Sequence, residues 1–244
     1  MSCNCRDVNP MKTDRGRHLL TPLRTALKVI HPEGMPWPVT VLYNAISRLD
    51  ILQETYRLIA RDILTYSSQG ALLDIGTGPA GLLVELNRLS PDLTVTGLDA
   101  SPSMVKRARK NMRHAGLSRI VTIREGNASD LPFPDASFDM VVSTGSMHHW
   151  KRPKEAFNEI FRVLTDGGYA LIYDLVSDTP ATIMRHTARR FGRLNMILMW
   201  VHAFEEPFYS RSAFALLPRD TCFGSGESRF VGIMYSLTLQ KRSG

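Results

Sequence analysis

The chain of 244 residues is 43% hydrophobic and 22% charged, which is typical of a globular protein rather than a disordered one. This length suits one domain with added segments. The longest apolar run, residues 196–201, is far too short to span a membrane, and the N-terminal stretch lacks the apolar core of a signal peptide. Three cysteines, an odd number, argue against a disulfide framework and favour a reducing compartment. We therefore expect the protein in the cytoplasm.

The basic balance of the chain bears on its partners. The formal net charge is +7, which permits an anionic partner such as nucleic acid, an acidic lipid surface or an acidic substrate. Basic residues gather in residues 12–28 and 185–193, and no acid lies between Asp178 and Glu205. A merely basic soluble protein is the simpler interpretation.

In chain order, prolines at positions 22, 32, 36 and 38 interrupt any long helix in residues 1–40, so we expect irregular structure there. Helical periodicity covers residues 44–67. Strands alternating with helices follow, which predicts a parallel, doubly wound, Rossmann-like sheet of the α/β class. The strands are expected at 71–75, 94–98, 120–124, 138–143 and 168–174, the helices at 80–89, 102–115 and 153–164, and a further strand at 228–240.

A glycine-rich turn connects the first of these strands to its helix. It reads Gly76-x-Gly78-x-x-Gly81, and the glycines let the backbone approach a ligand that the N–H groups of the helix start would face. Asp99 ends the second strand, where it can accept hydrogen bonds from both hydroxyls of a ribose. Together these features predict a nucleotide-type ligand at the carboxyl ends of the strands.

Asp74 restricts the kind of nucleotide. It lies two residues before Gly76, where its negative charge would repel a pyrophosphate. This disfavours an NAD-dependent oxidoreductase. A cationic amino acid that carries a sulfonium would be favoured by the same charge.

The stretch from Glu125 to Trp150 extends the pattern, through the block Leu-Pro-Phe-Pro-Asp-Ala-Ser-Phe-Asp, a strand, and Gly-Ser-Met-His-His-Trp. Over residues 70–175 the chain resembles the class I S-adenosylmethionine-dependent methyltransferases, in the small-molecule branch (type 11/25-like) that includes ubiquinone and menaquinone biosynthesis methyltransferases. The resemblance implies a mostly parallel seven-stranded sheet with an antiparallel last strand. It also implies an N-terminal lid, residues 1–67, and a methyltransferase domain, residues 68–244, with a helical insertion at about 178–209.

The resemblance further implies S-adenosylmethionine as cofactor, with S-adenosylhomocysteine as product. The glycine loop would hold the methionine part and Asp99 the ribose. Ala100 and Ser101 would lie beside the adenine, and Asn127 and Ala128 would contact its edge. Asn127 stands where the family more often has Asp, and its carbonyl still offers an acceptor to the adenine amino group. The implied cofactor-binding residues are Asp74, Gly76, Thr77, Gly78, Asp99, Ala100, Asn127, Ala128, Ser143 and Tyr43.

Methyl transfer is an in-line displacement, so positioning of acceptor and methyl group carries much of the rate. A general base is needed only for a protonated acceptor such as a phenol. His148, with His149 beside it, follows the fourth strand and resembles a catalytic histidine of some O-methyltransferases. The alternative is that these histidines cap the next segment or pack under the lid.

Two further features leave alternatives open. Cys3 and Cys5 could bind a soft metal, but a frayed terminus is the simpler interpretation, and we expect no metal site. Residues 184–204 are basic early and apolar late. They could line a pocket for a hydrophobic acceptor, rest on a membrane surface, or pack in the core.

Nucleic acid is disfavoured as a substrate. Enzymes that methylate the amino groups of adenine or cytosine carry an Asn/Asp/Ser-Pro-Pro-aromatic motif after the fourth strand, and this chain lacks it there. No cysteine lies between positions 6 and 221 to attack cytosine. Two functions stay open: an enzyme that methylates a small, apolar or aromatic acceptor, or a regulatory or partner protein that binds the cofactor without turnover. The pattern does not decide the oligomeric state.

Overall fold

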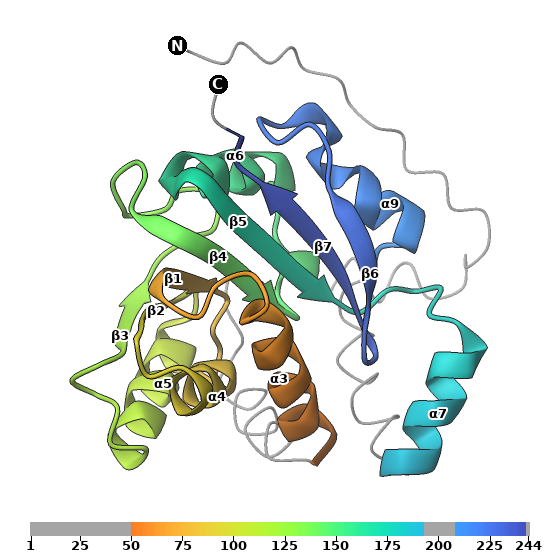
Figure 1. Ribbon diagram of the computed structural model, residues 1–244, viewed down its shortest axis with the longest axis horizontal. Coiled ribbons are helices and arrows are strands. Elements are labelled where there is room, and N and C mark those ends of the chain that lie inside the picture. Colours follow the sequence, from red (N-terminus) through yellow and green to blue (C-terminus); the bar gives the residue numbers. More distant parts are fainter. Residues whose placement is uncertain (1–49, 193–207, 243–244) are drawn as a thin grey trace, which may run out of the picture.

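The computed structural model describes residues 50–192 and 208–242. Its elements form an α/β domain (Figure 1). They are α3 (Asp50–Ile63), β1 (Gly70–Ile75), α4 (Gly81–Leu89), β2 (Leu93–Asp99), α5 (Pro102–His114), β3 (Thr122–Glu125), β4 (Phe138–Thr144), η1 (Met147–His149), α6 (Pro153–Val163), β5 (Leu164–Asp174), α7 (Ala181–Phe191), α9 (Arg211–Leu216), η3 (Leu217–Asp220), β6 (Glu227–Val231) and β7 (Met234–Gln240).

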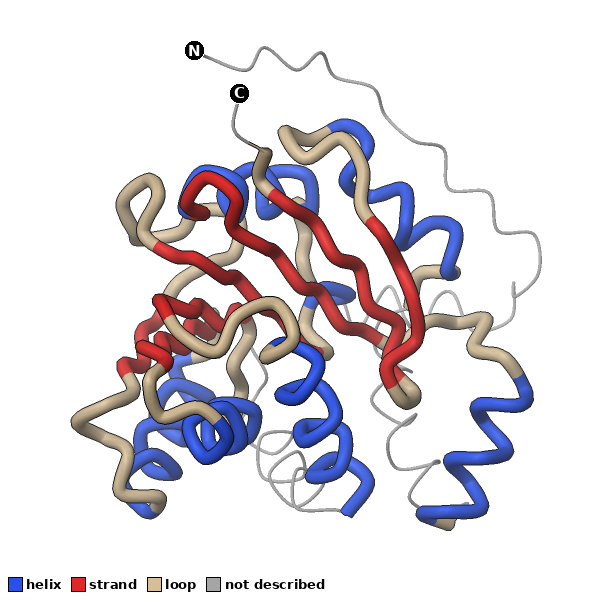
Figure 2. The backbone as a smooth tube through the Cα atoms, in the orientation of Figure 1, coloured by secondary structure: helices blue, strands red, loops and turns tan. Residues whose placement is uncertain are grey.

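The seven strands form one sheet in the order β3-β2-β1-β4-β5-β7-β6 (Figure 2). The strands β1 to β5 pair in parallel, whereas β7 is antiparallel to β5 and β6 is antiparallel to β7. The expected mostly parallel, seven-stranded sheet with an antiparallel last strand is confirmed. The connection from β3 back to β4 crosses the sheet, so the direction of winding reverses between β1 and β4, and such a reversal is where open α/β sheets bind ligands.

Helices cover both faces of the sheet and separate its core into two clusters. On β1, Leu72 belongs to the cluster that includes residues of α3, α4 and α5, and the next residue, Leu73, belongs to the cluster that includes α6 and α9. Successive strand residues point to opposite faces, so a parallel strand buried on both faces reads as a continuous apolar run. Ile59 and Ile63 on α3 are fully buried, so this helix is part of the layer that faces the core.

The C-terminal region differs from expectation. Residues 228–240 do not form one strand: β6 and β7 are a hairpin that turns at Gly232, which has φ +60°. Apolar residues continue in alternation through Val231 and Ile233, so the periodicity alone did not reveal the turn. Glycine tolerates this left-handed conformation, whereas a side chain would strain it.

Helix α3 is shorter at its C-terminal end than the expected 44–67, and residues 44–49 lie outside the described residues. It ends at Ile63, after which Thr65 N donates to Asp62 O in a tightened last turn. Strand β5 begins at Leu164 rather than 168, with a register shift against β4 between Phe138 and Met140. Of the expected insertion 178–209, the structure describes α7 and the residues around it, but not 193–207.

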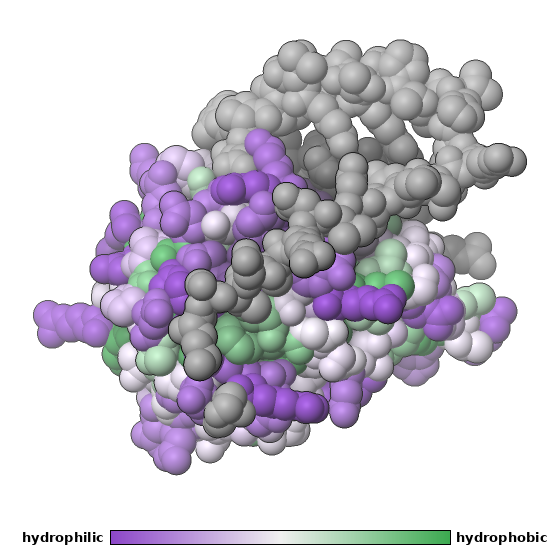
Figure 3. All heavy atoms as spheres, turned by 90° about the horizontal axis from the view of Figure 1, so that it is seen from above, coloured by the Kyte–Doolittle hydropathy of each residue, from purple (hydrophilic) through white to green (hydrophobic). Residues whose placement is uncertain are grey.

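On the face seen in Figure 3, the described residues show hydrophilic areas with hydrophobic areas between them. Among the described helices, none is long and apolar enough to cross a bilayer. In the same part of the chain, no group of three or more His, Cys, Asp or Glu side chains is arranged to hold a metal ion.

Candidate functional site

The carboxyl ends of the parallel strands bring most of the predicted residues to one edge of the sheet. Strands β1, β2 and β4 end at Ile75, Asp99 and Thr144, and the glycine loop begins directly after β1. Parallel strands present their carboxyl ends at the same edge, so segments far apart in sequence meet here.

The glycine loop is fixed by the neighbouring strand. The N–H groups of Gly76 and Thr77 both donate to the carbonyl oxygen of Leu98, at 2.8 and 3.0 Å. Gly76 has φ +73°, and a Cβ at this position would lie 2.2 Å from Ser146 Oγ. The first glycine is therefore required twice, for its left-handed backbone and for the close approach of Ser146.

The third glycine of the motif has a packing function. A Cβ at Gly81 would lie 2.6 Å from the ring of Tyr56 on α3, so the absence of a side chain lets α3 lie against the start of α4. Ala80 precedes the helix with a left-handed φ of 65° and makes no side-chain cap. The first N–H groups of α4 therefore donate no hydrogen bond to an N-cap side chain.

Asp74 is a buried carboxylate at the centre of this edge. Its exposed fraction is 2%. Burial raises the pKa of Asp74 to about 7; the nearby Thr77 hydroxyl offsets part of the rise, and the charge of Asp99 adds to it. Asp74 Oδ1 and Thr77 Oγ1 are both buried without a hydrogen-bond partner among the described residues. Because buried polar atoms are nearly always paired, these two atoms indicate a polar or cationic ligand.

Asp99 joins the glycine loop to the segment after β2. Its Oδ2 accepts from Gly78 N at 2.8 Å, and its Oδ1 accepts from Ser101 N at 2.9 Å. Burial raises the pKa of Asp99, and these two backbone donors oppose the rise. Ala100, next in the chain, is exposed. The carboxylate is thus oriented by the backbone on both sides and retains lone pairs for further donors.

Asn127 and Ala128 lie close to Asp99 at the same edge. Gly126 N donates to the carbonyl oxygen of Asp99 at 3.1 Å, which places the segment after β3 beside the end of β2. Asn127 Oδ1 accepts from Ser129 N at 2.9 Å in a local turn. The side-chain carbonyl that the sequence offered to an adenine amino group thus already accepts one hydrogen bond within the protein.

Ser143 connects the ends of β4 and β1. Its hydroxyl is 2.7 Å from Ser146 Oγ, and Ser146 Oγ donates to Ile75 O at 3.1 Å. Ser143 is fully buried. Its position at the edge is as expected, and its hydroxyl takes part in the link that holds Ser146 against Gly76.

His148 forms a buried pair with Asp174 at the end of β5. Its Nδ1 lies 2.9 Å from both carboxylate oxygens, and its backbone N–H donates to Asp174 Oδ2 at 3.0 Å. Leu175 N donates to Asp174 Oδ1 at 2.8 Å. The side chain of His148 is 2% exposed, whereas His149 is exposed.

Sequence reasoning missed two of these residues. Asp174 ends β5 as Asp99 ends β2, and this repeated position of an acid was a signal that could have found it. Ser146 carried no such signal, because its contact with Gly76 depends on tertiary structure. Three residues weighed above, Tyr43, Cys3 and Cys5, lie outside the described residues.

Residues 73–172, which contain most of this edge, match the model of a family described as a methyltransferase domain. The seven-stranded sheet, the glycine loop after β1 and the acid at the end of β2 agree with that match. This part of the chain is thus similar to the methyltransferase domain of the class I S-adenosylmethionine-dependent enzymes.

Three proteins illustrate the similarity. The chain is 38% identical over 115 residues to 2-methyl-6-phytyl-1,4-hydroquinone methyltransferase 2, chloroplastic, of Oryza sativa subsp. japonica, covering 47% of this chain and 32% of that protein. It is 31% identical over 133 residues to demethylmenaquinone methyltransferase of Deinococcus radiodurans, covering 54% of each. The matches thus span between a third and about half of these curated relatives.

A crystal structure from Methanococcus maripaludis, of a protein described as an S-adenosyl-L-methionine-dependent methyltransferase, superposes with a TM-score of 0.63. The match covers 96% of this chain and 99% of that one at 23% identity. At this level of identity, the likeness concerns the fold.

Proposed function

We propose that this protein transfers a methyl group from S-adenosylmethionine to a small, apolar or aromatic acceptor. The names of the two curated relatives described above specify a phytylated hydroquinone and demethylmenaquinone as acceptors, which supports an acceptor of this class. S-adenosylmethionine supplies a methyl group activated by a sulfonium, and the electron pair of the broken bond stays on sulfur. Everything else is binding and positioning by the chain.

The observation that carries the proposal is the pair of buried atoms without partners, Asp74 Oδ1 and Thr77 Oγ1, at the place where the sheet reverses its winding. A carboxylate and a hydroxyl suit the cationic amino group of a methionine moiety. The first N–H groups of α4 suit its carboxylate. Asp99, oriented by two backbone donors, suits two ribose hydroxyls. The residues present therefore fit this cofactor.

His148 is proposed as the proton acceptor for a phenolic acceptor. In the tautomer that donates Nδ1–H to Asp174, the basic lone pair lies on Nε2. His149 offers a matched control because it is adjacent and exposed. We expect His148→Asn to lower turnover of a hydroquinone by roughly 10²–10⁴-fold with S-adenosylhomocysteine affinity unchanged, and His149→Asn to retain turnover. Equal turnover in the two variants would exclude this role.

The experiment that tests the function is calorimetric titration of S-adenosylhomocysteine into the wild type and into Asp99→Ala. Tight binding to the wild type that is strongly weakened in the variant supports the cofactor site. A methylation assay with hydroquinones and S-adenosylmethionine then separates the enzyme from a binding protein without turnover. No binding to the wild type would overturn the proposal.

A further inference from the structure

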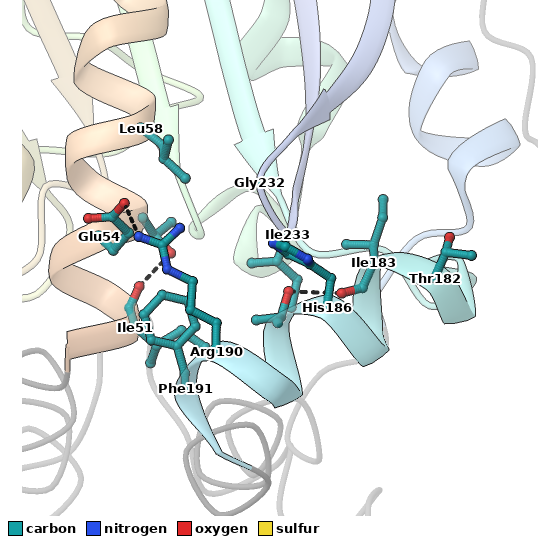
Figure 4. Close-up of a pocket in the computed structure, with 12 residues that line it drawn as sticks. Ile51, Glu54, Leu58, Thr182, Ile183, His186, Arg190, Phe191, Gly232 and Ile233 are labelled. Atoms are coloured by element: carbon teal, nitrogen blue, oxygen red, sulfur yellow. Dashed lines mark hydrogen bonds and ion pairs between the residues drawn. The ribbon is translucent and has the colours of Figure 1, made fainter.

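A cavity of about 320 Å³ lies outside the edge described above, between α3, α7 and the β6–β7 hairpin (Figure 4). This volume is at the lower end of the range for small-molecule sites. Side chains from all three elements converge on it in the close-up view. The apolar members of its wall are Ile51, Leu58, Ile183, Phe191 and Ile233.

Four of the polar side chains in the wall have partners within the protein, and two others, Thr182 and His186, are exposed. The hydroxyls of Thr55 and Thr187 donate to the carbonyl oxygen four residues earlier in their own helices, at 2.7 and 2.9 Å. Glu54 Oε1 and Arg190 Nη2 form an ion pair of 2.7 Å across the gap between α3 and α7. An anionic ligand would have to compete with Glu54 for Arg190, whereas an apolar ligand leaves all of these interactions intact.

The cavity adjoins the edge that carries the candidate methyl-transfer site. Ile233 in its wall precedes Met234, whose Cε lies 4.0 Å from the Cβ position at Gly145, directly after β4. On the other side, Leu58 Cδ1 lies 3.1 Å from the Cβ position at Gly232. The hairpin tip therefore connects the cavity wall to the carboxyl end of β4 within two residues.

We propose that this α3–α7 cavity binds the apolar chain of the methyl acceptor and so selects acceptors by chain length. The inference rests on the proposed function for the identity of the ligand. Three observations carry it: the apolar residues of the wall, the four polar side chains already paired within the protein, and the position beside the end of β4. The Glu54–Arg190 ion pair connects the two helices at the cavity, and the Arg190 side chain is 52% exposed.

The test uses hydroquinones with linear alkyl chains of increasing length, titrated calorimetrically into the full-length protein with and without S-adenosylhomocysteine. We expect the affinity to rise about fourfold for each added methylene until the cavity is full. Ile183→Trp fills the cavity and should remove at least tenfold of the affinity for the longest chain. Arg185→Trp is the matched control, because Arg185 is exposed on α7 and does not line the cavity.

The outcomes separate this inference from the function on which it rests. Loss of chain-length dependence in Ile183→Trp but not in Arg185→Trp, with unchanged S-adenosylhomocysteine affinity, supports the cavity. Affinity that is independent of chain length in the wild type overturns it, even where the cofactor product binds. Failure of the cofactor product to bind overturns the proposed function instead. Should Ile183→Trp not fold, Ile183→Ala keeps the test: an unchanged affinity for long chains overturns the inference.

Discussion

Asp174 accepts the ring N–H of His148 and two backbone N–H groups, and both side chains are buried. The pair joins the turn after β4 to the end of β5, 26 residues apart. Three donors point at this carboxylate, and its two oxygens can accept all three hydrogen bonds. An asparagine amide at this position would instead turn an N–H group toward one of the donors.

We therefore expect Asp174→Asn to lower the free energy of unfolding by about 1–3 kcal/mol, because it leaves a buried donor unpaired. Chemical denaturation measures this change. Asp178→Asn is the control: Asp178 pairs with Arg211 at the surface, where an ion pair contributes at most about 1 kcal/mol. Equal stability of Asp174→Asn and the wild type would show that the carboxylate charge is not needed for the pair.

Asp74 makes the stability of the ligand-free protein depend on pH. Burial raises its pKa to about 7, from an ordinary value of 3.8. Between these two values the unfolded chain releases the proton first, so the Asp74 contribution to stability is lost as pH rises from about 4 to about 7. Asp74→Asn should remove this loss. Its free energy of unfolding at pH 8 should exceed that of the wild type by up to a few kcal/mol, at roughly 1.4 kcal/mol per pKa unit. Denaturation of both proteins at pH 5 and pH 8 measures it, and parallel profiles would contradict it.

The same carboxylate predicts proton release on ligand binding. A cationic amino group beside Asp74 favours the ionised form and lowers its pKa, so the affinity for S-adenosylhomocysteine should rise as pH increases from 5 to 7 and then level. Calorimetry in two buffers with different ionisation enthalpies gives the number of protons released. We expect a release that approaches one proton near pH 6. Asp74→Asn should abolish it, and a proton release that persists in this variant would assign it to another group.

The features that the sequence could predict are those that local pattern determines. Apolar runs that end in Asp74 and Asp99, with the glycine turn between them, indicated parallel strands and their common edge. The hairpin at Gly232 was not predicted, because the alternation of apolar residues continues through it. The pairing of Asp174 with His148 was not predicted, because it depends on where two segments meet in space. The α3–α7 cavity arises in the same way, from side chains on three elements that no sequence spacing relates.

The contact between Gly76 and Ser146 can be tested by comparison with Gly116, a second glycine with the same backbone conformation as Gly76. Gly76 and Gly116 have φ of +73° and +75°, but a Cβ at Gly116 meets nothing within 4 Å. Gly116→Ala therefore measures only the left-handed backbone cost, roughly 1–2 kcal/mol.

Gly76→Ala adds a clash with Ser146, which is held by the hydroxyl of Ser143 and the carbonyl oxygen of Ile75. We expect it to be destabilised well beyond Gly116→Ala and to lose S-adenosylhomocysteine affinity at least tenfold in calorimetry. If the two variants are equally stable and bind equally well, the approach of Ser146 does not restrict this position, and the loop yields without cost to the site.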